Sequence, residues 1–148
     1  MSNVNIHACN DYAVRHSCRD GLLEVAKWLY ELGGVDIHTN NDQAFRWSCF
    51  KGHLNVAKWL YELGGGEVNI HARNDEAFKW SCFNGQLDVA KWLYGLSNIS
   101  IHVKNEVFIS SCESNLKIAK WLHGLGEIDI HAQGDEAFFR SCCSGHLE

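Results

Sequence analysis

Apolar positions recur along the chain at helical spacing, in segments that alternate between short and longer. The segment from Leu23 to Leu32 carries a wide apolar stripe of Leu23, Val25, Ala26, Trp28, Leu29 and Leu32. Its opposite face is charged, with Glu24 three residues before Lys27. This pattern predicts an amphipathic helix. The segment before it, between Asp11 and Gly21, predicts a helix of about two and a half turns, which is too short to be stable alone.

The same pair of segments repeats along the chain. Ile-His occurs at residues 6, 37, 70, 101 and 130, so that successive histidines are 31, 33, 31 and 29 residues apart. Ser-Cys and Ala-Lys-Trp-Leu follow at matching offsets in the complete repeats. We therefore expect one array over residues 1–148, with repeats at about 4–34, 35–67, 68–98 and 99–127 and a partial repeat at 128–148.

The ends of the predicted helices are marked in each repeat. The first helix is expected to begin after an N-cap residue that accepts a backbone N–H. These residues are Asp11, Asp42, Asp75, Asn105 and Asp135. It is expected to end at a residue that tolerates the left-handed conformation. These residues are Gly21, Gly52, Gly85, Asn115 and Gly145. One repeat cannot bury its own apolar faces, so the repeats are expected to stack, with Trp28, Trp59, Trp92 and Trp121 between layers.

These repeats resemble ankyrin repeats over nearly the whole chain. Residues 76–93 follow the family's T-P-L-H-x-A-A-x-x-G-H-L-x-V-V-x-L-L line, and the G-H-L turn recurs at residues 52–54 and 145–147. The resemblance implies an all-α solenoid of stacked helix-turn-helix units. The style of the repeats, with I-H-A and N-D-x-A, is similar to ankyrin repeat proteins of giant DNA viruses of amoebae.

The repeats depart from the family in ways that affect the expected fold. The T-P-L-H tetrapeptide is missing, so the hydrogen bonds that it makes in the family are not assumed. Most repeats are shorter than the usual ~33 residues. Because the shortfall precedes the first helix, the projecting β-fingers are expected to be stunted or replaced by short loops. The sequence stops within the second helix of the fifth repeat, so we expect a fragment or a gene product without its natural continuation.

Composition and charge narrow the setting and the partners. The 148 residues have a formal net charge of −5 and no cluster of Lys and Arg, which argues against a nucleic-acid partner. No apolar run approaches the ~18 residues of a membrane span. The chain begins with no signal peptide, and five of seven cysteines recur at one repeat position, which a disulfide framework does not require. We expect an intracellular, cytoplasmic protein, in a host cell if it is viral.

The repeated histidines and cysteines raise two weaker alternatives. A metal site needs four converging ligands at ~2.0–2.3 Å. Equivalent residues of stacked repeats are instead about one helix spacing apart, ~8–10 Å. A catalytic Cys–His pair such as Cys82 with His71 has no third residue to orient it. We therefore expect no enzyme, no cofactor, no metal and no small-molecule substrate.

The resemblance to ankyrin repeats implies a protein partner bound on the concave side, through loop tips and the exposed face of the first helices. The residues expected there are His16, Arg19, Trp47, Phe50, Trp80, Phe83, Arg73 and Lys104. Trp47 with Phe50 and Trp80 with Phe83 are i,i+3 pairs expected to form one aromatic patch. An alternative is that Trp47 and Trp80 are mainly wedged between repeats.

The function expected from this surface is protein–protein interaction without catalysis. A structural spacer within a longer ankyrin repeat protein is the alternative. An exposed apolar patch on the concave face would favour binding, and a uniformly polar face would favour the spacer.

Overall fold

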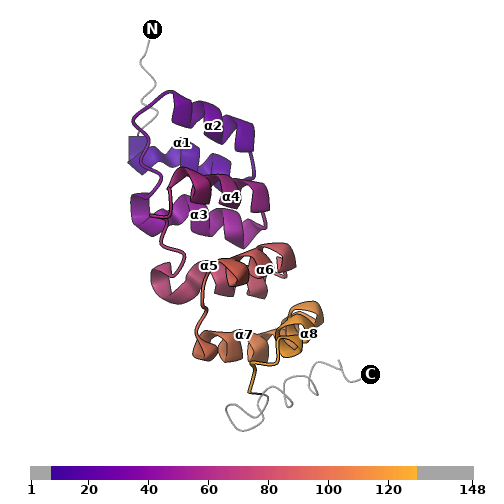
Figure 1. Ribbon diagram of the computed structural model, residues 1–148. Coiled ribbons are helices and arrows are strands. Elements are labelled where there is room, and N and C mark those ends of the chain that lie inside the picture. Colours follow the sequence, from indigo (N-terminus) through magenta and orange to yellow (C-terminus); the bar gives the residue numbers. More distant parts are fainter. Residues whose placement is uncertain (1–7, 130–148) are drawn as a thin grey trace. The chain divides into compact units, whose positions relative to one another are not determined.

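The computed structural model of the chain describes residues 8–129, and the helices of this part follow one another in pairs (Figure 1). They are α1 Ala8–Arg19, α2 Leu23–Glu31, α3 Thr39–Lys51, α4 Leu54–Leu63, α5 Ala72–Phe83, α6 Leu87–Leu96, α7 Ile101–Ser114 and α8 Leu116–Gly124. The chain divides into two compact units, Met1–Ala77 and Phe78–Glu148, which are described separately below as the N-terminal and C-terminal units. Most of the predicted fifth repeat lies outside the described residues.

Each compact unit is built from paired helices around an apolar core. In the N-terminal unit α1 packs against α2 and α3, and α3 packs against α4, around Phe45 and Leu60. In the C-terminal unit α7 packs against α8, with Phe78 and Leu122 buried. The segments of residues 8–129 that join the helices are short and contain no strand. The predicted all-α repeat fold with short loops is therefore confirmed.

Aromatic rings join successive repeats along the second helices. In the N-terminal unit the rings of Tyr30 and Trp59 meet edge to face, with centroids 6.1 Å apart. In the C-terminal unit Tyr94 and Trp121 do the same at 5.8 Å. The expected placement of tryptophan between layers therefore holds for Trp59 and Trp121. It is wrong for Trp28, which is 58% exposed.

A glycine sets how closely two repeats approach. Gly21 follows α1 with a φ of +76°, which glycine adopts without strain. A Cβ placed there would lie 2.6 Å from the His53 ring of the next repeat. Gly21, Gly52 and Gly85 all have the predicted left-handed conformation.

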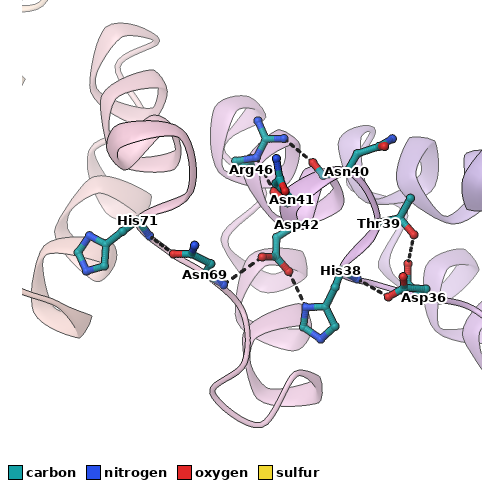
Figure 2. Close-up of polar contacts among 9 residues, drawn as sticks. All are labelled: Asp36, His38, Thr39, Asn40, Asn41, Asp42, Arg46, Asn69 and His71. Atoms are coloured by element: carbon teal, nitrogen blue, oxygen red, sulfur yellow. Dashed lines mark hydrogen bonds and ion pairs between the residues drawn. The ribbon is translucent and has the colours of Figure 1, made fainter.

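The second and third repeats begin with an unusual left-handed turn. Within the bounds of α3, Asn40, Asn41 and Asp42 have φ values of 58°, 57° and 54°, so the right-handed helix starts only after Asp42. Asn and Asp are the residues other than glycine that adopt this conformation most readily. Arg46, one turn into the helix, holds the turn by donating from Nε to the Asn41 carbonyl at 2.8 Å and from Nη2 to the Asn40 carbonyl at 2.9 Å (Figure 2).

The carboxylate of Asp42 connects two repeats (Figure 2). Its Oδ1 is 2.6 Å from Nδ1 of His38 in the same repeat, and its Oδ2 accepts the backbone N–H of Asn69 in the next repeat at 3.0 Å. Asp11 likewise accepts the N–H of Asp36 at 3.2 Å. Asp42 therefore accepts a backbone N–H as predicted, but the expectation that this N–H belongs to its own helix is wrong.

A second polar contact joins successive first helices. Nη1 of Arg15 donates to the Gln43 side-chain carbonyl, and the buried Arg46 forms an ion pair with Glu76. In the C-terminal unit Nζ of Lys79 lies 3.5 Å from Glu106. These cations stand where the family resemblance leads one to expect histidine, and each pairs with a residue of the following repeat.

The fourth repeat starts differently from the second and third. The helix α7 begins at Ile101, and Ser100 caps it by accepting the N–H of Val103 at 3.3 Å. Asn105 therefore lies inside the helix, and its prediction as an N-cap is wrong. Asn115 was expected to be left-handed, but its φ is −152° and its side chain caps α8 by accepting the N–H of Ile118 at 3.2 Å.

We predict that the Asp42 carboxylate stabilises the fold through its hydrogen bonds, and not only because Asp tolerates a positive φ. Asp42→Gly removes the carboxylate but keeps a residue that tolerates positive φ, and should lower the free energy of unfolding by about 1–3 kcal/mol. The matched control is Asn74→Gly, at an exposed residue with a φ of 60°. This control should stay within about 1 kcal/mol of the unchanged chain. Urea denaturation followed by circular dichroism compares them, and equal effects would contradict the prediction.

Candidate functional site

An aromatic and cationic group of side chains lies on α1 and α3 in the N-terminal unit. The ring of Tyr12 stacks on that of His16 at 3.7 Å, and His16 meets Trp47 edge to face at 5.4 Å. The guanidinium carbon of Arg19 is 5.9 Å from the centroid of the Trp47 ring. We call Tyr12, His16, Arg19 and Trp47 the Trp47 cluster.

Helical spacing brings the cluster together. Tyr12, His16 and Arg19 are four and three residues apart, so they share one face of α1, and α3 packs beside that helix with Trp47 on it. Tyr12 is 52% exposed, and the other three side chains are half-buried. The cluster is therefore held by packing and still open to solvent.

Neighbouring groups influence the protonation of His16 and the pairing of Arg19 in this cluster. Burial, reinforced by the positive charge of Arg19, lowers the pKa of His16, so this ring is neutral near pH 7. Arg19 is paired with Asp20, with 2.7 Å between Nε and Oδ1, and this hydrogen bond lowers the pKa of Asp20. Because the pair is exposed, it is weak and can exchange for a partner's carboxylate.

The chemistry of the cluster suits a protein contact. Tyrosine, tryptophan and arginine are the residues that most often dominate binding energy at interfaces. The Trp47 ring also has the Arg15 guanidinium carbon 6.0 Å from its centroid, within the range of a cation–π contact. Sequence reasoning identified His16, Arg19 and Trp47, but missed Tyr12. Its spacing of four residues from His16 could have identified it, because residues four apart lie on the same face of a helix.

The other aromatic residues of the predicted patch fall in both compact units. Phe50 is half-buried in the N-terminal unit, with Nζ of Lys51 5.0 Å from its ring centroid. Trp80 and Phe83 lie in the C-terminal unit with ring centroids 6.3 Å apart, and Trp80 is 44% exposed. The alternative of a mainly wedged tryptophan therefore does not fit Trp80. That all four aromatics form one patch stays a prediction.

Arg73 and Lys104 were both expected on exposed loop tips. Arg73 is exposed and left-handed, and lines a polar cleft of about 460 Å³ in the N-terminal unit. The other lining residues are His38, Asn41, Asp42, Glu67, Asn69 and Ala72. Several of these groups already bond one another across the repeats, as Asp42 does with His38 and Asn69.

The expected exposure of Lys104 is wrong. It lies within α7 and is buried, because this helix begins one turn earlier than the corresponding helices of the preceding repeats. Its ammonium group bonds Glu127 and lies 5.0 Å from the centroid of the Tyr94 ring.

The repeated cysteines are core residues. Cys18, Cys49, Cys82 and Cys112 carry buried thiols. Burial raises the pKa of the Cys18 thiol to about 12, and raises the pKa of Cys49 and Cys82 as well. The thiolate is the form that attacks substrates and binds metals, and burial suppresses it. Within residues 8–129, no group of three or more His, Cys, Asp or Glu side chains is placed to hold a metal ion.

No helix in the described part of the chain is both long and apolar enough to span a membrane.

The family to which the chain belongs is decided by comparison with known proteins. The sequence model described as "Ankyrin repeats (3 copies)" matches residues 12–105. The chain belongs to the ankyrin repeat family. Ankyrin repeats are protein-interaction modules and are typically not catalytic. No curated protein matches the sequence.

An ankyrin-like fold is also found among solved structures. The structure described as "Bd0816 Predatory Endopeptidase from Bdellovibrio bacteriovorus in complex with immunity protein Bd3460" contains a chain that superimposes with a TM-score of 0.63. The match covers 93% of this chain and 94% of that chain at 14% sequence identity. At this identity the likeness concerns the fold alone.

We predict that the buried thiols do not react in the folded protein. Near pH 8, Cys18, Cys49 and Cys82 should resist a thiol reagent because their raised pKa values keep them protonated, and they should react once the chain is unfolded in urea. Mass spectrometry of labelled peptides identifies the modified positions, with the unfolded chain as the control. Labelling of Cys18 in the folded protein at the rate of the unfolded chain would contradict its burial.

Proposed function

We propose that this ankyrin repeat protein is a non-catalytic interaction module that binds a protein partner through the face of its first helices, the concave side in the family. The Trp47 cluster is the observation that carries the proposal. It combines an exposed tyrosine, a half-buried tryptophan and an arginine on adjacent helices. These are the side chains that contribute most when an interface is desolvated.

The solved structure with a similar fold supports this kind of role. Its description names a complex between an endopeptidase and an immunity protein, so a fold of this type occurs in a protein complex. We extend this to the present chain only as far as the class of partner, which is a protein. The choice of partner depends on surface side chains, and only 14% of the residues are identical in the two chains.

The proposed setting is intracellular. Its support is the repeated position of buried cysteines, which fits a reducing compartment. The resemblance of the repeats to those of giant amoebal viruses motivates a narrower proposal, in which the protein acts on a viral or host partner.

The experiment compares the proteins captured by the unchanged chain and by an Arg19→Ala, Trp47→Ala double variant. Loss of the ring and the guanidinium should reduce capture of a specific partner by about tenfold or more. Quantitative mass spectrometry of the captured proteins provides the measurement.

Lys58→Ala, at an exposed residue of α4, is the matched control and should leave capture unchanged. Circular dichroism must show the same helix content for all three proteins. Equal capture by the unchanged chain and the double variant would place the interface elsewhere. Absence of any specific partner would favour the structural spacer.

A further inference from the structure

The first repeat exposes an apolar surface on the side that faces away from the second repeat. Val25 and Trp28 are three residues apart on one side of α2, and Leu22 and Leu32 flank the two ends of this helix, with Leu32 four residues after Trp28. All four are large exposed apolar side chains. We call Leu22, Val25, Trp28 and Leu32 the α2 end face.

The same positions are covered in the later repeats. Val25 is 42% exposed, whereas its equivalents Val56, Val89 and Ile118 are 1%, 1% and 0% exposed. Trp28 corresponds to Trp59, whose ring packs on Tyr30 of the preceding repeat. The α2 end face therefore continues the series of contacts that join one repeat to the next.

Two positions of the first repeat differ from this series in polarity. Leu22 stands where the later repeats have the polar residues His53, Gln86 and Asn115. Tyr12 stands where they have Gln43, Glu76 and Glu106, which accept the cation of the preceding repeat. A further repeat of this kind would bring its cation to a tyrosine and find no carboxylate or amide there.

The α2 end face is also unlike a terminal cap. The outer face of a capping repeat is polar, because it must stay in water. Here the polar position of the later repeats is instead apolar at Leu22, and two charged residues of α2, Glu24 and Lys27, pair with each other at 3.3 Å. An apolar patch of this kind favours burial against another apolar surface.

We propose that the α2 end face is the contact between two copies of this chain related by a two-fold axis. A two-fold contact places the same patch on both sides, so an apolar surface meets an apolar surface without requiring a cation acceptor at Tyr12. The contact is small, since one side of a nine-residue helix is about 13 Å long. It falls at or below ~1,200 Å², the lower limit of standard interfaces, so a weak dimer with a dissociation constant of about 10–100 μM is expected.

The test is sedimentation equilibrium of the full chain from about 5 to 500 μM, a range that brackets such an affinity. The unchanged chain should pass from monomer to dimer and stop there. Trp28→Glu should remain monomeric throughout, because it buries a charge in the contact. Trp80→Glu is the matched control, since Trp80 is also an exposed tryptophan but lies on α5, and it should dimerise as the unchanged chain does.

A second variant on the α2 end face, Val25→Lys, should also remain monomeric, so that the result does not depend on one substitution. Circular dichroism should show unchanged helix content in all variants, which excludes a folding defect. A monomer at every concentration would overturn the proposal. So would growth beyond the dimer, which indicates head-to-tail stacking, or equal loss of the dimer in Trp28→Glu and Trp80→Glu. These outcomes are independent of the Trp47 cluster, because no residue of that cluster is changed.

Discussion

The fold depends on the contact that each repeat makes with the next. A helix pair of this length cannot bury its apolar surface alone, so stability comes from the seam between neighbours. The carboxylate of Asp42 gives that seam its register. By holding His38 with one oxygen and the backbone N–H of Asn69 with the other, it fixes where the following repeat starts. The Tyr30 ring on Trp59 and the His53 ring against Gly21 fill the space between the repeats.

Much of this fold could be predicted from the sequence, because it is encoded by spacing. The 3.6-residue apolar period gave the second helices, and recurrence of Gly21, Gly52 and Gly85 gave the ends of the first. The direction of the Asp42 hydrogen bond could not be predicted, because an acceptor in the sequence does not specify which N–H reaches it. The fourth repeat was misjudged for a related reason. Alignment placed Lys104 in a loop, but Ser100 supplies a cap that starts α7 early and buries that lysine.

The candidate site was predictable where it follows helix geometry. His16, Arg19 and Trp47 occupy positions that vary between repeats, and they do lie together on α1 and α3. Tyr12 was missed because its position was read only as the start of a helix. The cysteines show the opposite case. Their recurrence invited a chemical role, whereas burial keeps their thiols protonated and makes them small core residues.

The hydrogen bond that Asp42 accepts from the next repeat also affects how such a protein can change in length. The acceptor lies in one repeat and the donor in the next, and the second repeat contains both positions, the donor at Asp36 and the acceptor at Asp42. A duplicated segment of about thirty residues therefore brings both partners of the hydrogen bond with it. Gene duplication or deletion can therefore add or remove a repeat without changes to the residues that join neighbouring repeats. In the first and last repeats of an array, only the donor or only the acceptor of this hydrogen bond has a neighbouring repeat to bond with. The other position is free of this requirement, so its residue can change and take on a different role.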